Sequence, residues 1–131
     1  GRKLLLHVED VMRSGDALPL IAPEALLRDG LLEMSRKGLG MTTILDDAER
    51  VIGVFTDGDL RRALDGQPDL QRTRMADVMT RDCKTVRPRM LAAEAVHIME
   101  TFRITALPVV DENGALVGAF NVHDLLRAGV M

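Results

Sequence analysis

Apolar residues recur along this chain at a helical spacing in two places. Leu27, Leu31 and Met34 fall at i, i+4 and i+7, so they share one face of a helix. We therefore predict a helix over residues 23–37, with Pro23 early in it and Gly38 at its end. The second half of the chain has a matching apolar stripe, which comprises Leu91, Ala95, Ile98, Met99 and Phe102.

Short runs of β-branched and aromatic residues, bounded by turn signals, predict the strands. Each half of the chain has two such runs joined by a polar turn, at residues 41–45 and 51–55 and at residues 106–110 and 115–120. Two shorter strands and two closing helices complete the pattern, at residues 18–21 and 84–86 and at residues 57–64 and 122–128. Each half therefore has the predicted order β-α-β-β-α.

The second half repeats the first. VIGVFTDGDLRRA at residues 51–63 returns as LVGAFNVHDLLRA at residues 116–128, an offset of 116 − 51 = 65 residues, and DVM at residues 10–12 returns at residues 77–79. The predicted fold class is α/β (α+β), with two pseudo-symmetric units at residues 1–66 and 67–131. Neither unit buries its apolar faces well alone, so we expect them to pack as one domain with a ligand between the copies.

Composition narrows the classes of function. A chain of 131 residues that is 47% hydrophobic and 28% charged fits a globular domain with one core. A net charge of −3, three Phe, no Trp and no Tyr argue against a nucleic-acid-binding protein. No apolar run approaches the roughly 20 residues of a membrane span. The chain begins at Gly1 without an initiator Met, so we expect it to be part of a longer protein.

Cys83 is the only cysteine, which excludes an internal disulfide and predicts a reducing, cytoplasmic location. Its neighbours Arg81 and Lys84 are expected to lower the pKa of its thiol. They belong to a basic stretch over residues 72–89, which is either a solvated linker surface or a lip that attracts phosphate. The basic residues of this stretch are Arg72, Arg74, Arg81, Lys84, Arg87 and Arg89.

Catalytic and metal-binding motifs are missing from the sequence, including the Walker A, G-x-G-x-x-G, H-E-x-x-H and nucleophile-elbow patterns. The informative place is the predicted turn from strand to closing helix. There Thr56 and Asp59 place a hydroxyl and a carboxylate three residues apart, a pair that can bind the diol of a sugar. The N–H groups of the helix N-terminus, with Arg61 and Arg62, would suit a phosphate.

The same pair also fits a helix capping box, in which Thr56 is the cap and Asp59 returns to the backbone. The second copy carries Asn121 and Asp124 at these positions, and Asn is also a capping residue. Capping and ligand binding are compatible, so both interpretations stay open.

These motifs resemble a tandem pair of CBS domains, the module named after cystathionine β-synthase. The resemblance rests on DVM before each unit, the two Gly-x-Phe-x-x-x-Asp-Leu endings and ITALPVVD at residues 104–111, and it covers nearly the whole chain. Residues 1–6, 55–62 and 123–130 also resemble the C-terminal part of D-arabinose-5-phosphate isomerases. In that family an upstream sugar isomerase domain interconverts ribulose 5-phosphate and arabinose 5-phosphate, on the route to the Kdo sugar of lipopolysaccharide. The resemblance therefore implies a non-catalytic part of such an isomerase.

CBS pairs commonly bind adenine nucleotides in two clefts between their halves. The resemblance implies that Thr56 and Asp59 hold a ribose in one cleft and Asp124 in the other, where Asn121 replaces the usual Ser or Thr. It also implies base contacts near Thr42, Thr43, Thr105, Ala106 and Leu107. The expected effectors are AMP, ADP, ATP or the nucleotide sugar acid CMP-Kdo, and no cofactor or metal is expected.

The resemblance leaves three hypotheses for function. The leading one is a nucleotide-sensing module that regulates the attached isomerase domain. CBS pairs also self-associate into flat dimers, so the alternative is a dimerisation scaffold without a physiological ligand, within a full-length tetramer. A third hypothesis is that the chain completes the active site of a neighbouring subunit, with His7 as the nearby candidate.

Overall fold

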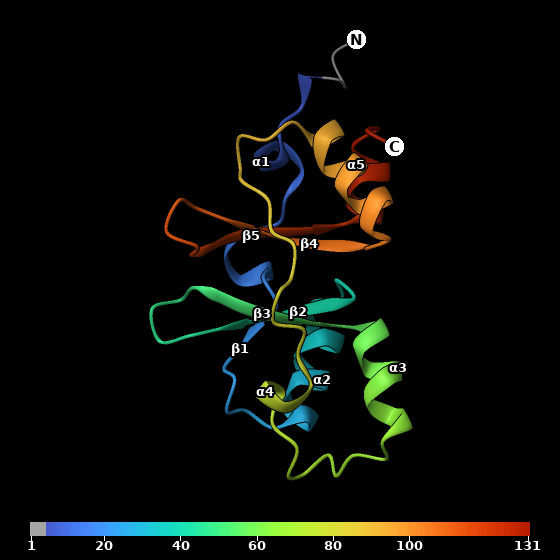
Figure 1. Ribbon diagram of the computed structural model, residues 1–131. Helices are drawn as coiled ribbons and strands as arrows, with labels where there is room; N and C mark the ends of the chain where they lie inside the picture. Colours follow the sequence, from blue (N-terminus) through green and yellow to red (C-terminus); the bar gives the residue numbers. More distant parts are fainter. Residues whose placement is uncertain (1–4) are drawn as a thin grey trace. The chain divides into compact units, whose positions relative to one another are not determined.

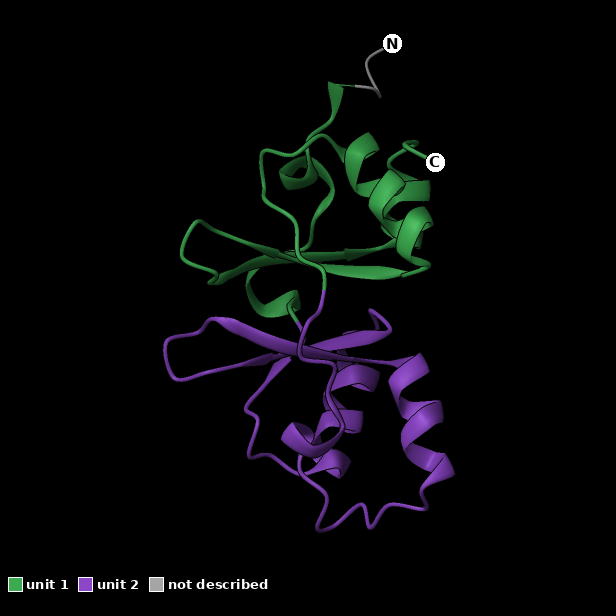
Figure 2. Cartoon of the chain, in the orientation of Figure 1, with its two compact units in different colours: residues 1–18, 84–131 green, residues 19–83 purple. Residues whose placement is uncertain are grey.

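The computed structural model describes residues 5–131 and divides the chain into two compact units (Figures 1 and 2). Unit 2 runs from Pro19 to Cys83, whereas unit 1 joins residues 84–131 to the segment that ends at Leu18. Residues 1–4, which enter the isomerase resemblance, lie outside the described residues. The repeats follow one another along the chain, and we call residues 5–18 the lead-in segment of the first repeat and residues 67–83 that of the second. Each compact unit contains the lead-in segment of the other repeat.

Unit 2 contains a three-stranded sheet with helices packed on it (Figure 1). In the sheet order β1-β2-β3, β1 is parallel to β2 and β2 is antiparallel to β3. Asp46 closes the β2–β3 turn by accepting hydrogen bonds from the backbone N–H groups of Ala48 and Arg50. The elements of this unit are β1 (Leu20–Ile21), α2 (Leu27–Lys37), β2 (Met41–Leu45), β3 (Val51–Thr56), α3 (Asp57–Asp65) and α4 (Met75–Val78).

Unit 1 repeats this arrangement with two strands. β4 (Ala106–Val110) and β5 (Leu116–Asn121) are antiparallel, and Asp111 closes their turn. The strand predicted at residues 84–86 is reduced to a single parallel bridge between Val86 and Val109. The other elements are α1 (Val8–Val11), a short 3-10 helix (Gly15–Ala17), α5 (Ala92–Phe102) and α6 (Val122–Arg127).

Each unit has its own apolar core, and each core includes a residue from the lead-in segment. In unit 2 Met75 packs with the predicted helix face, and the buried cluster comprises Leu27, Met34, Ile44, Phe55 and Met75. In unit 1 Val8 plays the corresponding part beside Ala95 and Met99 of α5. The predicted stripes are confirmed with one exception, because the side chain of Phe102 is 52% exposed.

The start of the first long helix differs from the prediction. α2 begins at Leu27, not at Pro23, because the preceding turn hydrogen-bonds to another segment instead of to the helix. The carbonyl of Pro23 accepts from the N–H of Ala76, and the carbonyl of Ala25 accepts from the N–H of Met75. The predicted end is confirmed, since Gly38 adopts a left-handed conformation with φ 66° at the C-cap.

The glycine repeated at residues 53 and 118 lets a lead-in segment lie directly against a strand. A Cβ on Gly53 would lie 2.8 Å from Sδ of Met79, and a Cβ on Gly118 would lie 2.3 Å from Sδ of Met12. The repeated Gly and the repeated Asp-Val-Met are therefore two sides of one contact, made once in each unit. Any larger residue in place of either glycine would push the lead-in segment away from its strand.

Candidate functional site

The predicted pair Thr56 and Asp59 forms a capping box at the start of α3. The N–H of Asp59 donates to Oγ1 of Thr56 at 3.2 Å, and the N–H of Thr56 donates to Oδ2 of Asp59 at 3.0 Å. Asp59 also accepts from the hydroxyl of Thr80 at 2.8 Å and from the guanidinium of Arg62 at 2.6 Å. The carboxylate is therefore buried and fully hydrogen-bonded within its own unit.

Asn121 and Asp124 form the same box at the start of α6. The N–H of Asp124 donates to the side-chain oxygen of Asn121 at 3.0 Å, and the N–H of Asn121 donates to Oδ2 of Asp124 at 3.1 Å. The other donors differ from those at Asp59. Nε and Nη2 of Arg13 lie 3.0 and 3.1 Å from the two carboxylate oxygens, and Arg127 adds a further hydrogen bond.

Both carboxylates are ionised at neutral pH. Burial by itself raises the pKa of Asp59, but hydrogen bonds from Arg62, Thr80 and Thr56 outweigh it and lower that pKa below its ordinary value. Burial acts in the same way on Asp124, and Arg13, the Asn121 backbone and Arg127 lower its pKa. Each turn therefore presents a negative charge whose oxygens already accept hydrogen bonds, so a sugar diol would have to replace some of these donors.

Arg61 and Arg62, predicted as phosphate ligands, have different surroundings. The guanidinium of Arg62 returns to Asp59, and its side chain is 72% exposed. Arg61 is exposed, and none of the hydrogen bonds or ion pairs within residues 5–131 holds it. Because Arg62 pairs with Asp59, Arg61 is the one of these two arginines that could bind an anion there. The acidic residues Asp57 and Asp59 in the first turn of α3 would oppose such an anion.

The structure brings the predicted base-contact residues next to these turns. In β2, Thr42 faces Phe55 of β3 and is therefore one position from Thr56 in the register. Both Thr42 and Thr43 are fully buried, and the hydroxyl of Thr43 donates to the carbonyl of Pro19 at 2.7 Å. Their side chains act inside the sheet, so contacts to a base from this segment would have to come from the backbone.

In unit 1 the neighbouring strand reaches the second turn at the predicted residues. Ala106 pairs with Asn121, and the carbonyl of exposed Thr105 accepts from the N–H of Val122 at 3.0 Å. By the offset of 65 residues, Ala106 corresponds to Met41 (106 − 41 = 65) and Leu107 to Thr42 (107 − 42 = 65). The two sets of predicted base contacts therefore share one position of the repeat, Thr42 and Leu107, and are otherwise adjacent along the strand.

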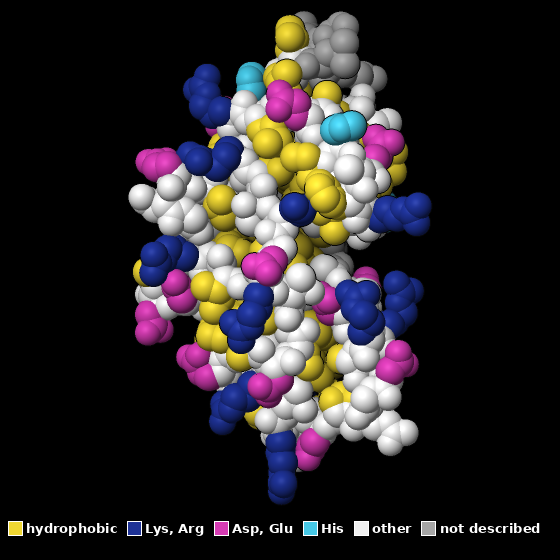
Figure 3. Space-filling view, viewed as in Figure 1, with side chains coloured by type: hydrophobic (Ala, Val, Ile, Leu, Met, Phe, Trp, Pro, Cys, Tyr) yellow, Lys and Arg dark blue, Asp and Glu magenta, His cyan; other side chains and the backbone are white. Residues whose placement is uncertain are grey.

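Two sequence-based predictions concern the stretch over residues 72–89. Its basic side chains are exposed and several have local partners, such as Arg87 with Glu112 at 3.7 Å and Lys84 over the ring of Phe102 at 4.1 Å. Figure 3 shows Lys and Arg interspersed with acidic side chains on its visible face. For residues 72–89, the exposure of the basic side chains and their pairs favour the solvated surface. The prediction for Cys83 was wrong in direction, because burial and the nearby Asp82 raise the pKa of its thiol.

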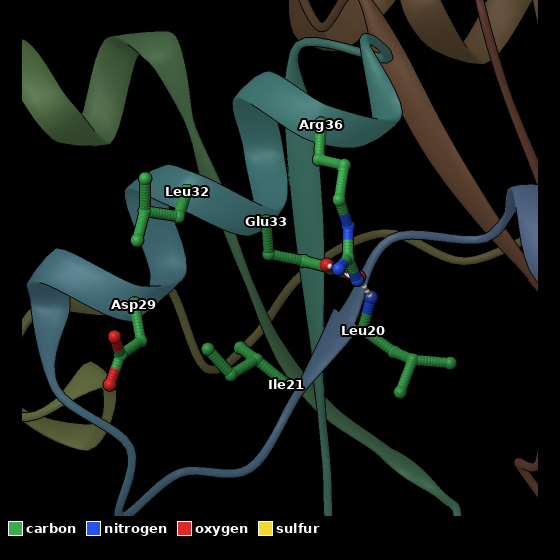
Figure 4. Close-up of a pocket in the computed structure, with 6 residues that line it drawn as sticks. All are labelled: Leu20, Ile21, Asp29, Leu32, Glu33 and Arg36. Atoms are coloured by element: carbon green, nitrogen blue, oxygen red, sulfur yellow. Dashed lines mark hydrogen bonds and ion pairs between the residues drawn. The ribbon is translucent and has the colours of Figure 1, made fainter.

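A pocket of about 300 Å³ lies between β1 and α2 (Figure 4). Glu33 occupies its polar end, where its carboxylate accepts from the N–H of Leu20 at 3.0 Å and pairs with Arg36 at 2.8 Å. Burial by itself raises the pKa of Glu33, but the hydrogen bond from Leu20 and the pairs with Lys37 and Arg36 outweigh it. The pKa of Glu33 therefore lies below its ordinary value. This carboxylate fastens the edge strand to the helix, and the residues that line the pocket include no predicted site residue.

Residues 5–131 contain no group of His, Cys, Asp and Glu side chains with the geometry of a metal site. The same residues form no helix that is long and apolar enough to span a membrane.

Arg13 and Thr80 are the residues of the turns that the sequence-based predictions missed. Both follow the repeated Asp-Val-Met directly, at residues 12 + 1 and 79 + 1, so the repeat itself carried the signal. Each pairs in an antiparallel bridge with an equivalent strand position, Arg13 with Ala119 and Thr80 with Val54. Their side chains thereby reach the two carboxylates from segments far away in the sequence.

Comparison with known families gives one clear match. The CBS domain family matches residues 8–66 and 75–130, which together cover most of the chain. Arabinose 5-phosphate isomerase KdsD of Pseudomonas aeruginosa is 56% identical to this chain over 131 residues. The match covers 100% of this chain and 40% of that protein, so the chain spans less than half of its relative's length.

Solved structures show the same fold. The crystal structure of CBSX2 in complex with AMP has a TM-score of 0.80 and 23% identity, and the match covers 95% of this chain and 97% of that one. The CBS domain pair of protein MJ0100, in complex with methylthioadenosine and S-adenosyl-L-methionine, has a TM-score of 0.83 and 19% identity and matches 94% of each chain. The predicted α/β repeat fold is thereby confirmed.

Proposed function

Because the chain belongs to the CBS domain family, we propose that it is a regulatory module that binds a nucleotide or a nucleotide sugar. Its catalytic partner in this proposal is a D-arabinose-5-phosphate isomerase domain on the same polypeptide, because the relative of Pseudomonas aeruginosa named as this isomerase is longer than the chain. Ligand binding would shift that domain between two states, which typically requires a coupling of about 1–3 kcal/mol. The expected effectors are AMP, ADP, ATP or CMP-Kdo, within a cytoplasmic enzyme.

The observation that carries this proposal is the carboxylate at the turn from β3 to α3. Asp59 is ionised, lies beside the Thr56 hydroxyl and accepts hydrogen bonds from the exposed residues Thr80 and Arg62. A ribose diol can donate two hydrogen bonds to such a carboxylate. The complexes of CBSX2 with AMP and of MJ0100 with adenosine derivatives are consistent with this assignment.

A second candidate function, the dimerisation scaffold, is favoured by a different observation. Large apolar side chains are exposed on helices in both units: Leu32 is 64% exposed on α2, Leu64 is 51% exposed on α3 and Leu126 is 51% exposed on α6. Such side chains mark a surface that meets another protein when they form a contiguous patch. In this alternative the capping boxes serve stability only and no ligand binds.

The two candidates are separated by thermal unfolding of the chain with AMP, ADP, ATP, CMP and CMP-Kdo. A ligand at 100 times its dissociation constant adds about 2.7 kcal/mol to the free energy of unfolding. We expect one of these ligands to raise the melting temperature of the chain, and we expect Asp59→Asn to abolish the rise. No rise with any ligand, together with a dimer in sedimentation, would favour the scaffold.

Two matched controls define the site. Asp57→Asn removes an exposed carboxylate from the same helical turn and should leave the ligand-induced rise unchanged. For the ligand, 2′-deoxy-AMP lacks one hydroxyl of the diol and should bind about tenfold to a hundredfold more weakly than AMP, as expected for one hydrogen bond to a charged group. Equal binding of the two nucleotides would contradict a diol contact at Asp59.

A further inference from the structure

The two strand-to-helix turns share their backbone geometry but differ in what holds their carboxylates. At Asp59 the long-range donor is the hydroxyl of Thr80, whereas at Asp124 it is the guanidinium of Arg13. The backbone places these two donors identically. Thr80 exchanges hydrogen bonds of 2.8 and 3.0 Å with Val54, and Arg13 exchanges hydrogen bonds of 2.8 and 3.1 Å with Ala119.

One donor at Asp124, the guanidinium of Arg13, is held firmly. The Arg13 side chain is 25% exposed and donates to both carboxylate oxygens, a bidentate arrangement that is among the strongest of charged hydrogen bonds. A ribose that bound there would replace charged donors with neutral hydroxyls. It would also leave the guanidinium of Arg13 without its carboxylate in a partly buried place, which is costly.

The donors at Asp59 are easily replaced. The side chain of Arg62 is 72% exposed, so it returns to water when it leaves the carboxylate, and an ion pair this exposed contributes little. Thr80 is exposed, and its hydroxyl can rotate away from Asp59 and accept a hydrogen bond from a ligand. A diol therefore gains access to Asp59 without breaking a fixed charged pair.

The net charge at the two turns differs in the same direction. Among residues 5–131, Arg62 is the cation that pairs with Asp59, whereas both Arg13 and Arg127 pair with Asp124. The first turn of α3 also carries Asp57, where α6 has the apolar Val122. Asp124 is therefore neutralised by two Arg side chains, whereas Asp59 can still accept hydrogen bonds from neutral hydroxyl groups.

We infer that Arg13 closes the carboxylate of Asp124 to ligands, so that each chain binds a single nucleotide, at Asp59. This inference rests on the proposed function, since it concerns which of the two repeats binds the nucleotide. Arg13 is the positioning residue that makes the repeats unequal, and it does so by occupying the place that a sugar diol would take.

Isothermal titration of the 131-residue chain with AMP, and separately with CMP, tests the inference through stoichiometry. We expect one nucleotide per chain, lost in Asp59→Asn and retained in Asp124→Asn. Arg13→Thr gives unit 1 the residue that unit 2 has at Thr80, and we expect it to raise the stoichiometry to two. The reciprocal change Thr80→Arg should abolish binding, and because Thr80 is exposed this variant does not disturb the core.

The possible failures are distinguishable. Two nucleotides per wild-type chain, or one that is lost in Asp124→Asn and kept in Asp59→Asn, would overturn the inference and leave the proposed function standing. A folded Arg13→Thr variant that still binds one nucleotide, or unchanged binding by Thr80→Arg, would also overturn it. If neither the wild type nor the Arg13→Thr variant binds a nucleotide, the proposed function is overturned, and the inference with it.

Discussion

The turns at Asp59 and Asp124 are two copies of one structural motif, 124 − 59 = 65 residues apart. Both are capping boxes, and both place a buried carboxylate at the start of a short helix. They differ in one residue of the lead-in segment, Thr80 in one unit and Arg13 in the other. The local sequence therefore determines the helix start, and a distant residue determines what else the carboxylate can bind.

Removal of each carboxylate should separate the two units most clearly. Asp124→Ala removes the carboxylate that pairs with the partly buried guanidinium of Arg13, so we expect the free energy of unfolding to fall by about 3 kcal/mol. Asp59→Ala loses a capping interaction and an exposed ion pair, so we expect a fall of about 0.5–2 kcal/mol. Urea denaturation measures both.

The double variant Arg13→Ala, Asp124→Ala is the control for the larger effect. It removes the pair as a whole, so we expect it to be less destabilised than the sum of the two single variants. Equal losses for Asp124→Ala and Asp59→Ala would contradict the difference between the units.

The glycine contacts should break the two units by a similar amount. Gly118→Ala would bring a Cβ within 2.3 Å of Sδ of Met12, and Gly53→Ala would bring one within 2.9 Å of the Thr80 carbonyl oxygen. We expect each to lower the free energy of unfolding by about 1–3 kcal/mol, because the lead-in segment must move. Gly66→Ala, whose Cβ would meet its nearest atom at 3.5 Å, is the control and should be nearly neutral.

Protonation perturbs both turns more gently, because a carboxylic acid keeps an acceptor oxygen for the cap. The pKa values of Asp59 and Asp124 are lowered in the folded chain, so the folded state binds fewer protons than the unfolded state. Stability from both groups is present above about pH 4 and falls as the pH drops through their lowered pKa values. Urea denaturation from about pH 6 downward, starting above the ordinary carboxyl pKa, should show this fall.

In the variant that carries both Asp59→Asn and Asp124→Asn, the dependence of stability on pH should be weaker over the same range. Asp57→Asn controls for the loss of one negative charge from α3. An undiminished dependence on pH in the double variant would assign the acid sensitivity to other carboxylates, such as Glu33, whose pKa is also lowered.

The smallest effect is expected at Arg62. Its side chain is 72% exposed, so Arg62→Ala should lower the free energy of unfolding by no more than about 1 kcal/mol. Arg13→Ala, measured beside it, should cost clearly more, because its guanidinium is held by both oxygens of Asp124. A cost for Arg62→Ala as large as that for Arg13→Ala would show that the donor at Asp59 is not easily displaced.

The sequence predicted the parts of this fold that depend on neighbouring residues. The strands at 41–45 and 106–110 match β2 and β4, and the three-residue spacing of Thr56 and Asp59 produced the capping box. Local hydrogen bonds and hydrophobic periodicity decide these elements, so a single segment carries enough information.

Other features were beyond local reasoning because their partners are distant. Arg13 pairs with Asp124, which is 111 residues away in the sequence. The carbonyl of Pro23 accepts a hydrogen bond from the N–H of Ala76 and is therefore not part of α2. The sequence offered Asp-Val-Met and the repeated glycine as separate motifs, and only the fold shows that they contact each other. The ligand-binding roles of the predicted site residues stay predictions for the titrations above.

The exchange of lead-in segments has a consequence for how the chain acquires its structure during synthesis. All the residues of unit 2 lie between 19 and 83, so this unit is translated before α5 and the strands β4 and β5. Val8 reaches its native contacts later, because its backbone N–H donates to the carbonyl of Met90 and its side chain packs beside α5. Contacts of such long sequence separation form slowly, because a large loop must close first. The segment before Pro19 is therefore translated ahead of unit 2 but can pack only after α5 has been made.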